Sequence, residues 1–139
     1  MSTPSTRIIH LLNFGRKLSE SVIKSIEELV KATVVEELVN VNLDLSKNLF
    51  IQVVSIVDKI PRESLRIDEN HRVVINLCGL PVAAVYIITE LHARLGVFPP
   101  VLEMTKDVNG DGLFASFKLK KVVDLERERI SSRSRMFTA

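Results

Sequence analysis

The chain has 139 residues, of which 46% are hydrophobic and 26% charged, and its formal net charge is +2. This length and composition predict a single globular domain over residues 1–139 with a sizeable core, and they exclude an intrinsically disordered chain. The small net charge argues against a protein that coats long nucleic acid. It leaves room for a small anionic ligand, which requires only a local basic patch.

The expected location is the cytoplasm. No apolar run reaches the roughly 18 residues of a membrane span, so no contact with a membrane is expected. The N-terminal segment MSTPSTR lacks the apolar core of a signal peptide. The single cysteine, Cys78, excludes an internal disulfide and is typical of a reducing compartment.

The first half of the chain alternates strand and helix patterns. Residues 1–6 are rich in Ser, Thr and Pro and are expected to be flexible, and residues 8–14 predict a buried strand. A helix follows with Ser19 as its N-cap, residues 33–43 predict a second strand, and a second helix runs from about Ser46 to Pro61. The expected buried face of the first helix comprises Val22, Ile23, Ile26, Leu29 and Val30.

The second half begins with a polar loop over residues 61–71. A β-branched run at 73–77 predicts a strand, and a long apolar segment at 82–95 predicts a helix. Pro81 suits the first turn of that helix, and Gly96 suits its C-terminal end. Asn109-Gly110 between strand-like runs at 100–106 and 113–121 predicts a hairpin. The tail from Val122 predicts a short, fraying helix, with residues from about 131 to 139 flexible.

The predicted order of elements is β-α-β-α-β-α-β-β-α. Alternating strands and helices favour parallel pairing through right-handed crossovers, and the hairpin adds an antiparallel edge. The sequence therefore predicts an α/β fold with a mainly parallel sheet, flanking helices and a C-terminal antiparallel hairpin.

Two predicted strand-to-helix turns are expected to meet at one edge of the sheet, where open α/β sheets bind ligands. The first turn, Asn13-Phe14-Gly15-Arg16, offers an amide, an aromatic side chain and a cation, although it could equally be an ordinary turn with a solvated arginine. The second is Cys78-Gly79-Leu80-Pro81, where free N–H groups at the helix start favour an anion such as phosphate. Neither GxGxxG nor GxxxxGK[ST] is present, which excludes a classical dinucleotide or P-loop site.

The predicted helix at 82–95 carries a second group of candidates. Tyr86, Glu90 and Arg94 recur every four residues and share a face, and His92 lies nearby. One interpretation is a surface ion pair of Glu90 with Arg94. The helix is otherwise nearly all apolar, more than one core face needs, so part of it is expected to be buried in a homodimer or larger assembly. These four residues are therefore candidate dimer or ligand contacts.

Other motifs point to no metal and no cofactor. Residues 107–112 match the start of an EF-hand loop, but its twelfth position is Lys118 instead of glutamate, and the hairpin explains the same residues. His10, His71 and His92 lack metal-ligand spacing. Cys78 has no Cys–His signature around it and is interpreted as a small apolar filler.

Three segments resemble a known family. They are LLNFG at 11–15, NLCGLPVAAVYIITELHARLGVFPPV at 76–101, and the late strand that leads into Val122-Val123-Asp124-Leu125. The most specific part is Glu-Leu-His-x-Arg-x-Gly-x-Phe-Pro at 90–99. Together they span most of the chain and resemble the small accessory proteins of type III CRISPR loci in the Csx group (member fifteen). The resemblance implies a Rossmann-like fold related to CARF domains and a role in cyclic oligoadenylate signalling during antiviral defence.

The resemblance implies a cyclic oligoadenylate ligand, cyclic tetra-adenylate first, and leaves three function classes open. These are a binding module that sequesters the messenger, a metal-independent ring nuclease in which the ribose 2′-OH attacks its own phosphate, and an interaction domain without a nucleotide ligand. The lack of an obvious acid–base constellation favours the first class over the second, and no catalytic residue is assigned. The expected ligand-binding residues are Asn13, Phe14, Gly15, Arg16, Asn76, Gly79, Leu80 and Pro81.

Overall fold

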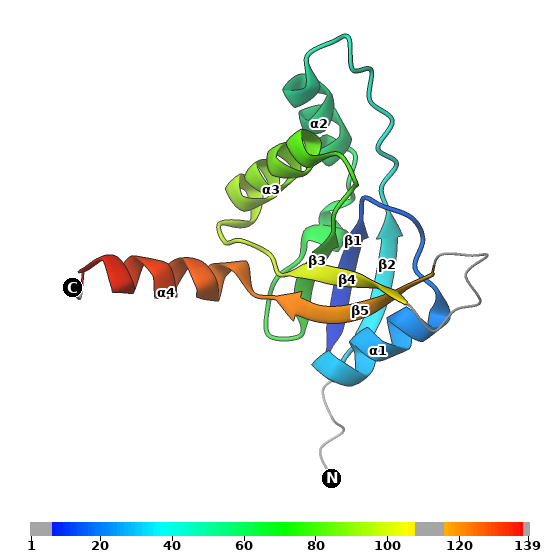
Figure 1. Ribbon diagram of the computed structural model, residues 1–139, viewed down its shortest axis with the longest axis vertical. Helices are drawn as coiled ribbons and strands as arrows, with labels where there is room; N and C mark the ends of the chain where they lie inside the picture. The colour runs from blue at the N-terminus through cyan, green and yellow to red at the C-terminus, as the bar shows by residue number, and fades with distance from the viewer. Residues whose placement is uncertain (1–6, 108–115, 138–139) are drawn as a thin grey trace.

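The computed structural model describes residues 7–107 and 116–137, and this part of the chain forms one five-stranded sheet with flanking helices (Figure 1). The predicted hairpin turn at 109–112 and the predicted flexible N-terminal residues 1–6 lie outside the described residues. The strands are β1 (Ile8–Asn13), β2 (Thr33–Leu38), β3 (His71–Asn76), β4 (Val101–Asp107) and β5 (Ser116–Val123). The helices are α1 (Glu20–Val30), α2 (Leu49–Asp58), the 3₁₀ helix η1 (Arg62–Leu65), α3 (Pro81–Leu95) and α4 (Leu125–Phe137).

The strands lie in the order β2-β1-β3-β4-β5. β1 pairs in parallel with β2 and β3, β3 pairs in parallel with β4, and β4 pairs antiparallel with β5. This confirms the predicted α/β class with a mainly parallel sheet and a C-terminal antiparallel pair, a Rossmann-like arrangement.

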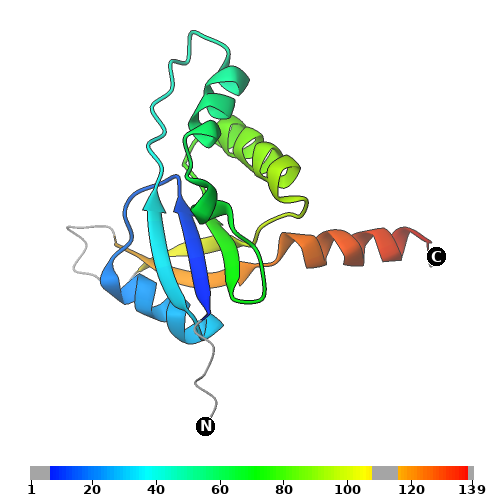
Figure 2. The ribbon, with the colours of Figure 1, turned by 180° about the vertical axis from the view of Figure 1, so that it is seen from behind.

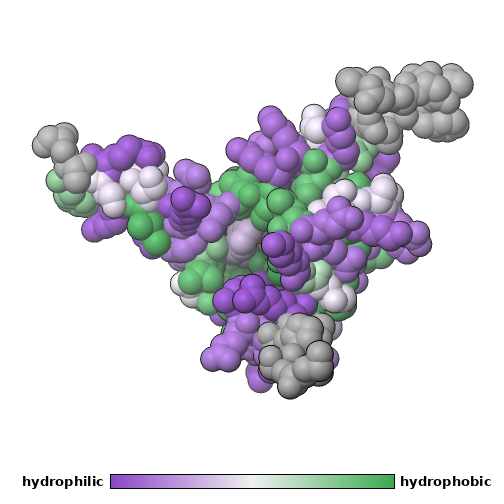
Figure 3. Space-filling view, turned by 90° about the horizontal axis from the view of Figure 1, so that it is seen from below, coloured by the Kyte–Doolittle hydropathy of each residue, from purple (hydrophilic) through white to green (hydrophobic). Residues whose placement is uncertain are grey.

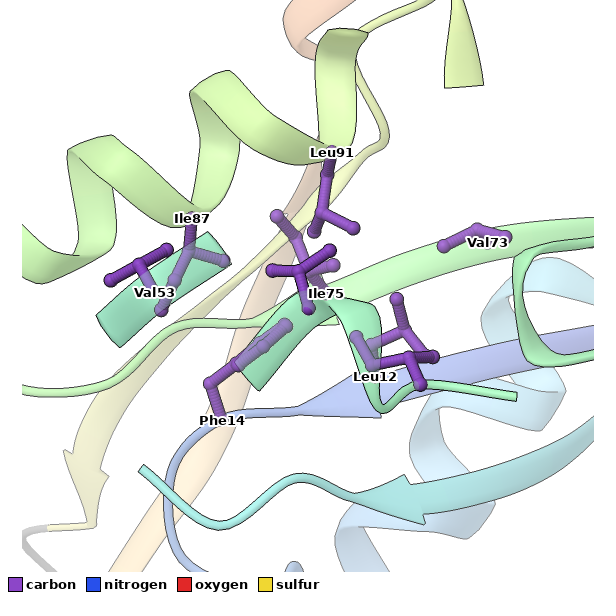
Figure 4. Close-up of a cluster of buried hydrophobic side chains, with 9 residues drawn as sticks. Leu12, Phe14, Val53, Val73, Ile75, Ile87 and Leu91 are labelled. Carbon is purple, nitrogen blue, oxygen red and sulfur yellow. The ribbon is translucent and has the colours of Figure 1, made fainter. Parts of the chain in front are cut away.

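The core lies on both faces of the sheet because successive side chains of a strand point to opposite faces. Leu12 of β1 and Ile75 of β3 pack against α2 and α3, whereas Leu11 and Val74 pack in the cluster that contains the buried residues of α1. Figure 4 shows the first of these clusters, and the views in Figures 1 and 2 show α2 and α3 together, away from α1. Helices that follow β1 and β3 therefore cover opposite faces.

The helix ends follow the sequence signals closely. The Ser19 side chain accepts a hydrogen bond from the N–H of Val22 at the start of α1. Pro81 is the first residue of α3, and Gly96 ends that helix with a φ of 78°, a conformation that favours glycine. One detail of the predicted α1 face was wrong, because the Leu29 side chain is 59% exposed.

The predicted strand over residues 33–43 was too long. β2 ends at Leu38 because its neighbour β1 ends at Asn13, and the last bond between them runs from the N–H of Val39 to the carbonyl of Asn13 at 2.9 Å. Beyond that point Val39 and Val41 instead pack against the α2–α3 cluster. α2 also starts later than predicted, with Asn48 as its N-cap, because Ser46 donates to the Asp44 carboxylate in a local turn.

The C-terminal helix is longer than the short helix expected from the sequence. α4 continues through residues 131–137, which the sequence analysis assigned to a flexible end, and every one of these residues is exposed. Among the helices in the described ranges, none combines the length and apolar character that crossing a membrane requires.

Candidate functional site

The centre of the sheet contains a topological switch point. β1 and β3 are neighbours, while the helices that follow them cover opposite faces, so the chain leaves the two strands in opposite directions. Such a point opens a crevice beyond the carboxyl ends of the strands, and ligands bind there in open α/β sheets. A cavity of about 800 Å³ lies at this position. This volume falls in the range of small-molecule sites.

The cavity is lined by residues from several elements. The cations Arg16 and Lys17 come from the loop after β1, and Asn76, Cys78 and Gly79 come from the end of β3 and the turn after it. The remaining polar contribution includes Asn40, beyond β2. Met104 and Phe117, from β4 and β5, add apolar surface, and the Phe117 side chain is 57% exposed. The crevice is therefore basic at one rim and apolar along the β4–β5 side.

Asn13 connects the two halves of this crevice. Its side-chain oxygen accepts hydrogen bonds from the N–H of Gly15 at 2.9 Å and from the amide of Asn76 at 3.0 Å. Its side-chain nitrogen donates to the carbonyl of Arg16 and to Glu36 Oε2, both at 2.8 Å. Asn13 is fully buried, and these four bonds use the full capacity of an amide. Asn13 therefore holds the loop after β1 against the end of β3, and its side-chain amide has no hydrogen bond left to offer.

Glu36 of β2 completes the arrangement. The same Glu36 oxygen that accepts from Asn13 also accepts from the main-chain N–H of Leu18 at 3.1 Å. One carboxylate thus fixes both ends of the loop over residues 14–18, and Arg16 and Lys17 remain exposed on it. Glu36 was not among the expected site residues, and β2 carries the adjacent pair Glu36 and Glu37, so no local signal marks one of them for this role.

Gly15 lies close to the end of β3. A side-chain carbon at this position would come within 3.2 Å of both Asn76 Nδ2 and the carbonyl oxygen of Leu77. The loop after β1 can therefore approach β3 this closely only because residue 15 has no side chain. By contrast, a side chain at Gly79 would meet no atom within 4 Å.

Phe14 has a different place from the one expected. Its side chain is buried in the α2–α3 cluster, and Figure 4 shows it pointing from the end of β1 toward Ile75. The expected aromatic face for a base is therefore absent at Phe14, although the residue borders the cavity. The exposed ring of Phe117, which was not among the expected site residues, also lines the cavity.

The second predicted turn contributes only in part. Asn76 and Gly79 line the cavity, whereas Leu80 and Pro81 lie outside its lining, at the start of α3. No side chain caps α3 within the part of the chain that the structure describes. The two predicted turns therefore lie together at one cavity. The residues that link them or line the cavity are Asn13, Gly15, Arg16, Asn76 and Gly79, whereas Leu80 and Pro81 do neither.

The candidates on α3 lie elsewhere, facing α2 and the segment after α3. The Tyr86 ring packs edge-on against Phe50 of α2, with centroids 5.4 Å apart. Arg94 pairs with Asp58 of α2 at 2.6 Å and with Glu90 at 3.3 Å, and its hydrogen bond to Asp58 raises the pKa of the guanidinium. The His92 ring stacks on Phe98 at 4.0 Å. The predicted Glu90–Arg94 ion pair is confirmed, and none of the four residues lines the crevice.

The other two histidines form a pair on the face that α2 and α3 cover. His10 Nε2 and His71 Nδ1 lie 2.8 Å apart across the neighbouring strands β1 and β3. Burial of His10, and next the adjacent His71, lower the pKa of the His10 imidazole from its usual value of 6.5. All three histidines are described by the structure, and none lines the cavity.

No group of three or more His, Cys, Asp or Glu side chains within residues 7–107 and 116–137 is placed to hold a metal ion. No protein-family model, curated protein or solved structure matches this chain. The chemistry of the crevice and the sequence resemblance therefore carry the functional argument.

Proposed function

We propose that the protein binds a cyclic oligoadenylate, cyclic tetra-adenylate first, in the crevice beyond β1 and β3, and damps type III CRISPR signalling by sequestering this messenger. The observation that carries the proposal is the Asn13-centred network, which holds a basic loop at the rim of an 800 Å³ cavity. The proposal also rests on the resemblance of residues 11–15 and 76–101 to the Csx group.

The rim suits phosphate. Arg16 and Lys17 are exposed beside the cavity, and a guanidinium can bind a phosphate through two parallel hydrogen bonds. Their main-chain N–H groups have no hydrogen-bond partner among the described residues. A phosphate at this loop would therefore receive both charge and main-chain donors.

The rest of the crevice suits a base. The Asn40 and Asn76 side chains both line the cavity, and an amide can pair with the edge of an adenine. Phe117 supplies an exposed aromatic face on which a base can stack. The proposal thus moves the expected stacking role from Phe14 to Phe117.

A homodimer is part of the proposal. Cyclic tetra-adenylate has four phosphates and four bases, so a twofold pair of protomers could each hold half of the ring. Val82 and Val85, on the first turns of α3 beside the crevice, are 53% and 61% exposed. The core of the protomer buries Ala83, Ile87 and Leu91 of this helix. Val82 and Val85 are apolar residues that the core leaves exposed, and a second protomer could cover them.

Sequestration is preferred over rapid cleavage because no histidine, aspartate or glutamate is among the described residues that line the crevice. None of the three histidines lines it. Fast proton transfer needs such a group within hydrogen-bond reach of the reacting atoms. In-line attack by the ribose 2′-OH needs only positioning and would be slow without that help.

The test is a titration of the full chain with cyclic tetra-adenylate, followed by chromatography of the nucleotide after incubation with excess protein. We expect saturable binding at micromolar concentration or below and recovery of the intact ring. Linear tetra-adenylate serves as the control and should bind more weakly. Absence of binding would favour the interaction-domain class, and rapid conversion to linear product would make the protein a ring nuclease.

A further inference from the structure

The C-terminal helix has no packing surface of its own in the protomer. α4 projects away from the sheet in both ribbon views, and none of its thirteen residues, all of which the structure describes, is buried (Figures 1 and 2). Isolated helices of about this length are marginal in water, and helices in proteins are stabilised mostly by packing. Ile130 and Phe137 of α4 are nevertheless 54% and 73% exposed.

Two of the three strongly exposed apolar residues of α4, Ile130 and Phe137, belong to one stripe, and the third, Met136, lies off it. Glu126, Ile130, Arg133 and Phe137 follow each other at intervals of four, three and four residues, the spacing of facing positions in coiled coils. The Arg133 guanidinium lies 5.2 Å from the centre of the Phe137 ring, and a shallow hollow runs past Ile130, Arg133 and Phe137. At the left of Figure 3, α4 shows hydrophobic side chains beside hydrophilic ones.

The two charged residues of this stripe lie toward opposite ends of α4, Glu126 in its first turn and Arg133 in its second half. The first half as a whole is neutral in formal charge, because Glu126 and Glu128 alternate with Arg127 and Arg129. A second copy of the helix laid antiparallel would place Glu126 of each stripe near Arg133 of the other, whereas a parallel copy would place Glu126 beside Glu126 and Arg133 beside Arg133. Of the possible occupants, a second copy running antiparallel matches this pattern.

We propose that α4 pairs antiparallel with α4 of a second copy, around a twofold axis near Ile130. Glu126 lies four residues before Ile130. In an antiparallel pair it is therefore level with residues 133–134 of the other copy. Seven residues away, or about 10 Å along the helix, Phe137 comes level with the base of the partner helix. Because each helix projects from its own sheet, the two protomers lie at opposite ends of the pair.

This pairing is independent of the proposed ligand and uses a surface other than the start of α3. The base of α4 is held to the protomer, since Glu126 accepts a hydrogen bond from the N–H of Phe98, in the segment after α3, at 3.0 Å. The orientation of the helix is therefore fixed where it leaves the sheet, and the stripe is presented to a partner without a change in the fold.

The test is sedimentation velocity of the ligand-free full chain over a range of concentrations. We expect a dimer, with Ile130→Asp raising its dissociation constant at least about 100-fold because both copies lose the same apolar contact. Arg133→Glu should also weaken the dimer. Arg135→Glu is the matched control, because it makes the same charge change on the opposite side of α4 and should dissociate as wild type does.

The unfolding temperature of each variant should stay near that of wild type, since Ile130, Arg133 and Arg135 are all exposed. A monomer at every concentration would overturn the proposal. A dimer that survives Ile130→Asp but is lost in Val85→Asp would also overturn it, because the start of α3 would then be the interface.

Discussion

The side-chain nitrogen of Asn76 donates to the side-chain oxygen of Asn13 at 3.0 Å, and the two residues are register partners at the ends of β1 and β3. The main chain repeats the link, because the N–H of Phe14 donates to the carbonyl of Asn76 at 2.9 Å. The two sides of the crevice are therefore one hydrogen-bonded unit, and a change at one strand end reaches the other.

The first prediction tests this unit. Asn13→Asp replaces the donor nitrogen with a second carboxylate oxygen, which would face Glu36 Oε2 at the present 2.8 Å. Two carboxylates at this distance, one of them buried, repel, and the Arg16 carbonyl loses its donor. We expect Asn13→Asp to lower the free energy of unfolding by more than about 2 kcal/mol in urea titrations at neutral pH.

The double variant Asn13→Asp with Glu36→Gln separates the repulsion between the two carboxylates from the other effects of replacing Asn13 on the free energy of unfolding. The glutamine amide that replaces the Glu36 carboxylate can donate to the new carboxylate at position 13, so at least about 1 kcal/mol should be recovered relative to the sum of the single changes. Additive losses would show that Asn13 and Glu36 do not act together.

The second prediction concerns the close approach of Gly15 to β3. Gly15→Ala places a carbon within 3.2 Å of the Leu77 carbonyl oxygen, a main-chain atom that cannot rotate away. We expect a loss of about 1–3 kcal/mol of stability, measured by urea denaturation. Gly79→Ala is the matched control, because the added carbon meets open space, and it should change stability by less than about 0.5 kcal/mol. Equal effects of the two substitutions would contradict the packing explanation.

Most of the fold could be predicted from local signals in the sequence. Each of three helix ends is marked by one residue: Ser19 caps through its hydroxyl, the ring of Pro81 restricts the main chain, and Gly96 permits a positive φ because it has no side chain. A single sequence is enough to recognise such residues. The order of strands and helices followed from hydrophobic periodicity. The sequence placed the two turns at the carboxyl ends of strands, but the switch point itself depends on the order β2-β1-β3-β4-β5, which the structure supplies.

The site could be predicted only in part, because its residues take their roles from distant partners. Glu36 and Asn13 are 23 residues apart, and nothing local marks that they share a hydrogen bond. The end of β2 depends likewise on where β1 ends, so the alternation of Val39 and Val41 extended the predicted strand past its partner. Phe14 offered an aromatic ring in sequence, but the core uses that ring.

The third prediction is a pH dependence that originates in the His10–His71 pair. Burial, the neighbouring His71 and Arg66 all lower the pKa of His10 in the folded state. The Asp68 and Glu63 carboxylates act in the opposite direction and reduce this shift. Below pH 6.5 the unfolded chain therefore binds more protons at this residue than the folded chain. Stability should fall as the pH drops from about 6.5 toward the lower folded pKa, and this contribution should level off beneath it.

The measurement is the urea midpoint between pH 7.5 and 5. His10→Gln should flatten the dependence over the window below pH 6.5, whereas His92→Gln, whose ring stacks on Phe98 away from the pair, should keep it. An unchanged slope in His10→Gln would assign the pH dependence to other groups.

The fourth prediction tests the basic rim. Arg16→Ala removes an exposed cation that lines the cavity and should weaken binding of cyclic tetra-adenylate about tenfold or more, as expected for a charge-assisted hydrogen bond. Arg62→Ala is the control, because Arg62 is an exposed arginine on η1 outside the cavity lining. Equal affinities for the two variants would make Arg16 an ordinary solvated residue.

The fifth prediction uses Cys78, the single cysteine of the chain, as a reporter of the crevice. Its side chain is half-buried and lines the cavity, with the sulfur 3.7 Å from the carbonyl oxygen of Leu80. A ligand that fills the cavity must cover this thiol, so saturating cyclic tetra-adenylate should slow its labelling by a maleimide at least about fivefold, in line with site occupancy.

The labelling rate in urea, where the chain is unfolded, gives the unprotected reference with and without nucleotide. Protection should be lost in parallel with affinity in Arg16→Ala and kept in Arg62→Ala. Tight binding without any slowing of the reaction would place the nucleotide at another surface and remove the switch-point crevice from the proposed function.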